Sequence, residues 1–387
     1  QEARIMAQGN PYNYLRIDRA EIDLPDGTDI HSDQVYAKAG QNLRAFIDDG
    51  VFVKEAEPAL YIYREVMDGR AQVGIVGCVA VDESLDGTIK KHEHTKPDKV
   101  EDRTRHIEAC QANTGTILLT YRDNARVEAI MANKMLEKPI YDFTSDDGVG
   151  HTVWKLAGEE MEAMVEAFKD IDNLYVADGH HRTAAAENYA AKMRKEVGDY
   201  TGQEEFNYYL AMIAPKKSLY VMDYNRVVED LNGHDFDTFR NLLTKNFLID
   251  QVDKAYKPRE KYEYGMYIDG VWYRLKVKDE VIDTINKTSK NLAIDLLDVS
   301  LLHDLLIEPI LGIDVPQRDK RIDFIGGIRG LGEIEKRVEE GMRLGFALYP
   351  TGIEELMAVA DMDGVMPAKS TWFEPKVRCG LFLHMMD

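Results

Sequence analysis

The residues best suited to chemistry follow a β-prone run in the middle of the chain. Residues 173–177 read Asn-Leu-Tyr-Val-Ala, a compact β-prone run, residues 178–182 read Asp-Gly-His-His-Arg, and residues 183–197 are Ala-rich with good helix formers. A glycine at such a strand-to-helix turn lets backbone approach a ligand closely, and the first amides of the helix form an anion site. A guanidinium there binds phosphate with two hydrogen bonds, and an imidazole adds a further hydrogen bond or a proton. The residues predicted to hold a phosphate are Gly179, His180, His181 and Arg182.

A second segment concentrates positive charge. Residues 90–106 carry six Lys/Arg, four Asp/Glu and three His, so substrate anions are attracted locally. If residues 89–95 are extended, His92 and His94 share one face and Glu93 lies on the other. Two interpretations remain open here. The histidines hold a metal, or Glu93 is the functional group, kept ionised by the surrounding positive charge.

A third segment, residues 366–376, lies near the C-terminal end. Pro367 and Pro375 mark an ordered but irregular loop. Between them Lys369, Ser370 and Thr371 offer one cation and two hydroxyl groups. Alone, this pattern indicates a polar loop without assigning a chemistry to it.

The rest of the chain supplies the elements that position these segments. Short β-rich runs alternate with amphipathic stretches, which predicts an α/β fold with a mixed, α+β sheet. The expected hairpins are 59–81, turning at Asp68-Gly69, and 264–277, turning at Asp269-Gly270. The expected helices are 33–50, 97–115, 183–197, 235–245 and 298–311. The sequence pattern changes after Pro215. We therefore expect a first, phosphate-binding catalytic domain over 1–214 and a second α+β domain over 215–387. The loop 366–376 of the second domain is expected to contribute to the site.

Composition narrows the class of protein. The chain has 387 residues with 48 Lys/Arg and 69 Asp/Glu, a net charge of −21. This charge repels polyphosphate backbones and anionic lipids, so we expect neither nucleic acid nor a membrane as partner. Three scattered cysteines fit a reducing, cytoplasmic compartment. The chain opens on Gln1-Glu2 rather than on Met, and we expect the natural protein to begin earlier.

The three segments together resemble those of a bacterial and archaeal family described as a conserved domain of unknown function. In the same order they resemble those of the free L-serine kinase of the ParB/sulfiredoxin-like superfamily. This resemblance implies a ParB/sulfiredoxin-like N-terminal domain with a second α/β domain packed against it. It also implies a nucleotide-dependent small-molecule kinase that phosphorylates free L-serine, or a related hydroxyl metabolite, to O-phospho-L-serine. The implied cofactors are ATP or ADP and Mg²⁺.

The resemblance also assigns roles by motif. Glu93 is the general base, the 178–182 turn cradles nucleotide phosphates, and the 366–376 loop lies near the amino acid. The residues given catalytic roles are Glu93, Asp178 and His180, and Asp178 is also the metal ligand. The residues placed on the substrate side are His92, Lys369, Ser370 and Thr371. Ala368 interrupts the Pro-Lys-Thr-Thr pattern of the kinase.

Two other functions compete with the kinase. A metal-dependent hydrolase would use His92, His94, His180 and His181 as ligands of a borderline metal. A non-catalytic ParB-like module would bind nucleotide at the same turn as a switch. The sequence leaves a homodimer open in each case.

Overall fold

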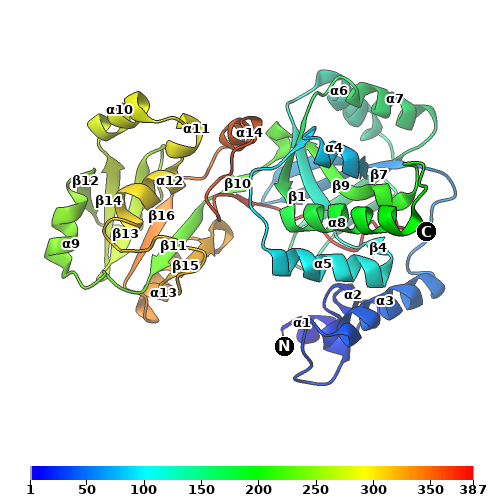
Figure 1. Cartoon of the computed structure of the whole chain (residues 1–387), viewed down its shortest axis with the longest axis horizontal. Coiled ribbons are helices and arrows are strands. Elements are labelled where there is room, and N and C mark those ends of the chain that lie inside the picture. The colour runs from blue at the N-terminus through cyan, green and yellow to red at the C-terminus, as the bar shows by residue number, and fades with distance from the viewer. Residues whose placement is uncertain (1, 387) are drawn as a thin grey trace. The chain divides into compact units, whose positions relative to one another are not determined.

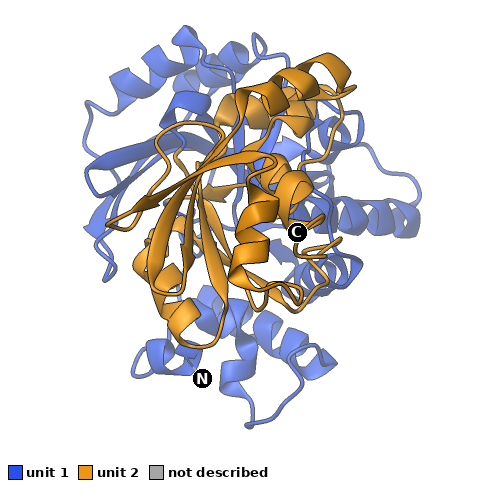
Figure 2. Cartoon of the chain, turned by 90° about the vertical axis from the view of Figure 1, so that its left-hand side faces the viewer, with its two compact units in different colours: residues 1–219, 375–387 blue, residues 220–374 orange. Residues whose placement is uncertain are grey.

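The computed structural model describes residues 2–386, which form two compact units. The first unit comprises residues 1–219 and 375–387, and the second comprises residues 220–374 (Figure 2). The sequence-based division at 214/215 assigned residues 375–387 to the second domain, whereas this segment returns to the first unit. The mixed α/β fold class predicted from the sequence is confirmed.

The first unit is built on an eight-stranded mixed sheet (Figure 1). In sheet order the strands are β3 (Ile89–Lys90), β8 (Leu174–Asp178), β5 (Ile117–Tyr121), β9 (Tyr208–Pro215), β2 (Arg70–Ala80), β1 (Leu60–Met67), β7 (Gly150–Leu156) and β6 (Tyr141–Thr144). Strand β3 is parallel to β8, and β5 is parallel to β9, while the other neighbours are antiparallel. Because β3 and β8 are parallel neighbours, the segments that follow them leave the sheet at the same end of the strands.

Helices of the first unit bury their apolar faces against this sheet and against one another. Their bounds are α1 (Glu2–Ala7), α2 (Leu15–Asp18), α3 (Asp33–Asp48), α4 (Val81–Leu85), α5 (Pro97–Cys110), α6 (Ala125–Lys134), α7 (Glu159–Phe168) and α8 (His180–Val197). Helices α6, α7 and α8 contribute Val127, Met164 and Ala186 to the main core. Helix α5 lies beside α8 (Figure 1), with Ile107 packed near Tyr189.

The C-terminal segment 375–387 completes the first unit. Its strand β18 (His384–Met385) pairs with β4 (Ala112–Asn113) in a small two-stranded sheet. Phe382 packs on Tyr61 and Tyr63 of β1, with ring centroids 5.1 and 5.7 Å apart. Since Ile62 between these tyrosines belongs to the main core, the segment covers the opposite face of the sheet.

The second unit has its own antiparallel six-stranded sheet (Figure 1). In sheet order the strands are β12 (Phe247–Val252), β14 (Val271–Val277), β13 (Glu263–Ile268), β16 (Leu344–Leu348), β11 (Tyr224–Val228) and β15 (Ile322–Gly326), and β10 (Val221–Met222) pairs separately with β17 (Trp372–Phe373). Its helices are α9 (Phe236–Leu243), α10 (Asp279–Thr288), α11 (Leu292–Asp295), α12 (Asp298–Leu302), α13 (Gly332–Glu339) and α14 (Ile353–Asp361).

Turn chemistry explains why the two predicted hairpins are confirmed. Asp68 and Asp269 have φ of 51°, and the glycine after each also has a positive φ, as a two-residue Asp-Gly turn requires. Three other expectations are wrong in extent. The helix predicted over 97–115 ends at Cys110, where Gln111 adopts a left-handed conformation. The helix predicted over 298–311 is α12 followed by a π-helical turn at His303–Ile307, and the strand predicted over 89–95 ends at Lys90. Among residues 2–386, no helix combines the length and apolar character that crossing a membrane needs.

Candidate functional site

The turn between β8 and α8 has the backbone conformation that the sequence predicted. Gly179 adopts a φ of 106°, a region that side chains other than glycine rarely enter. Helix α8 begins at His180, and its first amides have no carbonyl partner one turn earlier. The helix therefore presents a positive end to whatever lies beside this turn.

His180 is held inside the protein rather than at the surface. The backbone N–H of His92 donates to Nε2 of His180 at 3.4 Å, and the two rings meet edge to face with centroids 4.4 Å apart. Because Nε2 accepts a hydrogen bond, the neutral ring carries its proton on Nδ1. That nitrogen lies 3.6 Å from Oε2 of Glu93. His180 therefore orients both the 91–96 loop and the Glu93 carboxylate.

His181 makes the same kind of contact one residue later. Its Nε2 accepts the backbone N–H of Lys96 at 3.0 Å. Lys96 is the residue just before α5, which begins at Pro97. The two neighbouring histidines thus bind both ends of the loop that carries Glu93.

Burial fixes the charge state of His180 and His92. Removal from solvent, together with the charges of His181 and Lys91, lowers the pKa of His180 to about 3. Burial also lowers the pKa of His92 well below its usual range, and His180 acts in the same direction. Both rings are neutral at physiological pH. His180 can accept a backbone N–H only in this state.

Glu93 remains accessible to a ligand. Its side chain is 34% exposed, whereas that of His180 is 3% exposed. It lies in an irregular loop just after β3, beside the N-terminal end of α8. This position suits a carboxylate that orients a bound hydroxyl group and takes its proton.

The geometry does not favour the histidine metal site. His94 is exposed while His92 is buried, so the expected shared face for these two rings is wrong, because the strand ends before them. Nε2 of His180 already accepts a backbone N–H. In the described part of the chain, the metal-ligating atoms that gather within 4.8 Å belong to His303, Asp304 and Glu308, and the four histidines form no such group.

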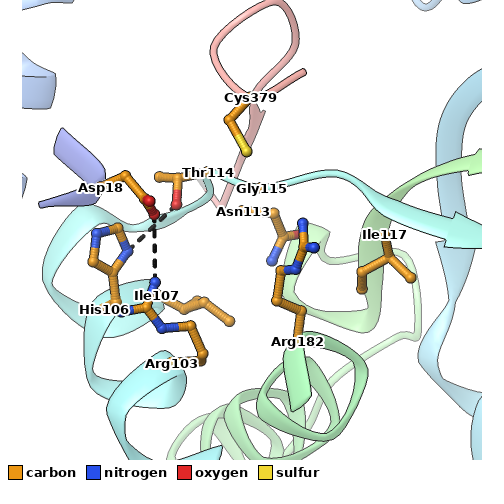
Figure 3. A pocket seen from close by; sticks show the side chains of 10 residues that line it. All are labelled: Asp18, Arg103, His106, Ile107, Asn113, Thr114, Gly115, Ile117, Arg182 and Cys379. Atoms are coloured by element: carbon orange, nitrogen blue, oxygen red, sulfur yellow. Dashed lines mark hydrogen bonds and ion pairs between the residues drawn. The ribbon is translucent and has the colours of Figure 1, made fainter. Parts of the chain in front are cut away.

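Arg182 points into a cavity of about 260 Å³ in the first unit (Figure 3). Its lining includes Asp18, Arg103, Thr114, Gly115, Arg182 and Cys379. Nη1 of Arg182 donates to the carbonyl of Thr116 at 2.6 Å, and a Cβ on Gly115 would lie 3.1 Å from that nitrogen. Among residues 2–386, no carboxylate pairs with Arg182. An unpaired guanidinium beside a cavity is a candidate anion ligand.

Arg103 faces the same cavity from α5, but its charge is balanced. It contacts Asp102 at 2.7 Å and Asp18 at 3.4 Å, and Figure 3 shows the second of these contacts beside the cavity. Arg103 was not singled out as a site residue in the sequence. The signal was its place in the basic 90–106 segment, one turn of helix after Lys99.

Asp178 lies at the end of β8, where its side chain is 38% exposed. Its Oδ2 is 3.3 Å from Nζ of Lys376. Lys376 belongs to the C-terminal segment of the first unit, 198 residues away along the chain. The sequence placed Lys376 at the end of a polar loop and gave no reason to pair it with Asp178.

The substrate-side residues of the third segment belong to the second unit. Lys369 has a φ of 63°, and its carbonyl accepts Nη2 of Arg226 at 3.0 Å. Ser370 is buried, its hydroxyl donates to the carbonyl of Pro367, and its own carbonyl accepts the hydroxyl of Thr351 at 2.9 Å. Thr371 is partly buried. The substrate role of all three stays a prediction.

The chain belongs to a family of proteins of unknown function, DUF1015, whose model matches residues 1–300. No curated protein matches the chain.

Several solved structures are similar at low identity. A free serine kinase in complex with AMP is 13% identical, with 77% of this chain and 86% of that chain covered and a TM-score of 0.35. SbnI with a C-terminal truncation, from Staphylococcus aureus, is 12% identical, with coverage of 79% and 84% and a TM-score of 0.38. A conserved hypothetical protein from Pyrococcus furiosus is 12% identical, with coverage of 79% and 93% and a TM-score of 0.34.

Proposed function

We propose that this protein is a nucleotide-dependent small-molecule kinase, which transfers a phosphoryl group from ATP or ADP to free L-serine or a related hydroxyl metabolite. One observation carries the proposal. Oε2 of Glu93 lies 3.6 Å from Nδ1 of His180, the first residue of α8. A candidate base and a candidate phosphate-binding turn therefore share one site, although they are 87 positions apart (180 − 93) in the sequence.

Phosphate binding is assigned to the 178–182 turn. Phosphoryl transfer depends on positioning and on stabilising the charge of the transferred group. The amides that begin α8 and the guanidinium of Arg182 supply both, because the charge of Arg182 is not neutralised by a carboxylate among residues 2–386. A cation in the first turn of a helix opposes the helix dipole. An incoming phosphate removes that conflict.

Proton transfer is assigned to Glu93. A carboxylate within hydrogen-bond reach of the acceptor hydroxyl orients it and takes its proton as the new O–P bond forms. Nδ1 of His180 lies 3.6 Å from Oε2 of Glu93. His180 is itself neutral and buried, so its support for catalysis is to hold Glu93 in place.

Mg²⁺ is assigned to Asp178. The side chain is partly exposed and offers carboxylate oxygens, the ligand type that Mg²⁺ prefers. A bound Mg²⁺ would neutralise phosphate charge during transfer. The contributions of His92, Lys369, Ser370 and Thr371 to serine binding rest on the sequence resemblance. His92 is buried against His180, which suits support of the loop better than direct contact with substrate.

The test is to incubate the protein with Mg²⁺, L-serine and either ATP or ADP, and to follow the products by phosphorus NMR. A phosphoserine resonance, with matching loss of one nucleotide phosphate, supports the proposal. The same assay with a panel of other hydroxyl metabolites tests whether the acceptor is a compound other than serine. Saturable nucleotide binding with no phosphorylated product from any acceptor would overturn the kinase and favour the non-catalytic nucleotide-binding module.

A further inference from the structure

The C-terminal segment places a lysine beside the turn that begins α8. Nζ of Lys376 lies 3.3 Å from Oδ2 of Asp178, the residue just before Gly179. Both side chains are partly exposed, at 46% and 38%. An exposed ion pair of this kind adds little to stability. A helix N-terminus favours a bound anion, and Lys376 lies where it could contact an anion held there.

The segment that carries Lys376 is anchored on both sides of this residue. Before it, the carbonyl of Pro375 accepts Nε2 of Gln72 at 3.3 Å. After it, Phe382 packs against two tyrosines of β1, and the backbone N–H of Met386 donates to the carbonyl of Gln111 at 2.9 Å. The lysine is therefore delivered to a defined place before any ligand binds, which reduces the entropy lost on binding.

The anchoring includes a buried carboxyl group. Glu65 of β1 has no exposed surface and accepts the Tyr63 hydroxyl and Nε2 of Gln72, each at 2.9 Å. The same Gln72 amide holds Pro375, next to Lys376. A polar network beneath the sheet thus continues into the segment that carries the lysine.

We propose that Lys376 is a phosphate-binding residue of the 178–182 turn, held by Asp178 until a nucleotide supplies a phosphate oxygen for its ammonium group. This inference rests on the proposed function and adds a residue from the far end of the chain to it. Its ligand is the terminal phosphate region of ATP or ADP. Lys376 then complements Arg182, which approaches the same turn from within the helix.

The experiment is calorimetric titration of ADP into the full chain and into three variants, Lys376→Met, Lys376→Arg and Lys217→Met. Lys217 is the matched control, because it is an exposed lysine of the same unit that pairs with Glu128. We expect Lys376→Met to weaken ADP binding by about 10-fold or more. Lys376→Arg should recover most of that loss, and Lys217→Met should change the affinity by less than about twofold.

Thermal unfolding of each variant separates binding from folding. Lys376→Met should unfold within about 2 °C of the wild type, because an exposed ion pair contributes little. If the wild type binds ADP and Lys376→Met binds it with the same affinity, the role of Lys376 is overturned and the proposed function stands. Failure of the wild type to bind ADP or ATP at millimolar concentration would overturn both.

Discussion

Two neighbouring parts of one helical turn do different work in this protein. His180 and His181 accept backbone N–H groups from residues 92 and 96, so they join the loop of Glu93 to α8. Arg182, the next residue, donates to one carbonyl and faces a cavity. A contiguous motif therefore divides into residues that position a carboxylate and a residue that is placed to meet a ligand.

Residue type alone therefore does not assign a role at such a turn. Imidazoles beside a phosphate-binding turn are expected to donate hydrogen bonds to phosphate. Here their Nε2 atoms are acceptors, and burial keeps His180 neutral by lowering its pKa. A guanidinium can only donate hydrogen bonds, and Arg182 is the residue of this motif that we propose binds phosphate.

The largest effect should come from Glu93→Gln. Losing the general base should lower kcat by about 10³-fold, while ADP affinity stays within about twofold. The measurement is serine-dependent loss of nucleotide phosphate, with ADP affinity measured in parallel. Glu101→Gln, at an exposed position on α5, is the control and should retain full activity. A Glu93→Gln variant as active as the wild type would refute the role of Glu93.

Replacing the buried imidazole of His180 should lower the free energy of unfolding more than it weakens ligand binding. His180→Ala leaves a cavity and leaves the N–H of His92 without its acceptor, which should cost about 3 kcal/mol of unfolding free energy. His181 sits nearer the surface, and His181→Ala should cost about 1 kcal/mol. Urea denaturation measures both. Equal losses at the two positions would contradict the division drawn between them.

Arg182→Met should weaken ADP binding more than it lowers the free energy of unfolding. We expect ADP affinity to fall about 10- to 100-fold, because a charge-assisted phosphate contact is lost. Unfolding free energy should change by less than about 1 kcal/mol. Arg126→Met, which removes an exposed arginine paired with Asp170, should leave ADP affinity unchanged. If Arg182→Met binds ADP as the wild type does, phosphate binding must be sought elsewhere.

Acidification should destabilise the folded protein, because the buried His180 stays neutral there. In the unfolded chain His180 gains a proton near its ordinary pKa of about 6.5, but in the folded protein its pKa is about 3. Between these values the unfolded state binds more protons, so stability is full above pH 6.5 and falls as the pH drops toward 3. From pH 7 to pH 5 we expect a loss of about 2 kcal/mol that His180→Gln lacks. Parallel pH profiles for the two proteins would contradict a neutral His180.

Sequence patterns predicted the local parts of this structure well. Asp68-Gly69 predicted the β1–β2 hairpin, and Gly179 predicted the turn into α8, because turn conformation depends on a few adjacent residues. The resemblance pointed to both Glu93 and the 178–182 turn. Their approach to within 3.6 Å depends on the parallel pairing of β3 with β8, which no local pattern specifies.

Long-range contacts account for what the sequence missed. The hydrogen bond from the His92 backbone to His180 spans 88 positions, and the contact of Lys376 with Asp178 spans 198. The return of residues 375–387 to the first unit is set by β18 pairing and by Phe382 packing on β1. None of these contacts has a periodic or motif signal. The π-helical turn after Asp298 was likewise hidden within a continuous helical pattern.

The nucleotide site at the turn that begins α8 is tested most directly by a calorimetric titration of the wild-type protein with ADP and Mg²⁺, performed with and without L-serine. We expect saturable binding of one nucleotide per chain, and further heat when serine is added to the nucleotide-bound protein. If neither ADP nor ATP produces saturable heat at millimolar concentration, that result would contradict a nucleotide site at the turn that begins α8.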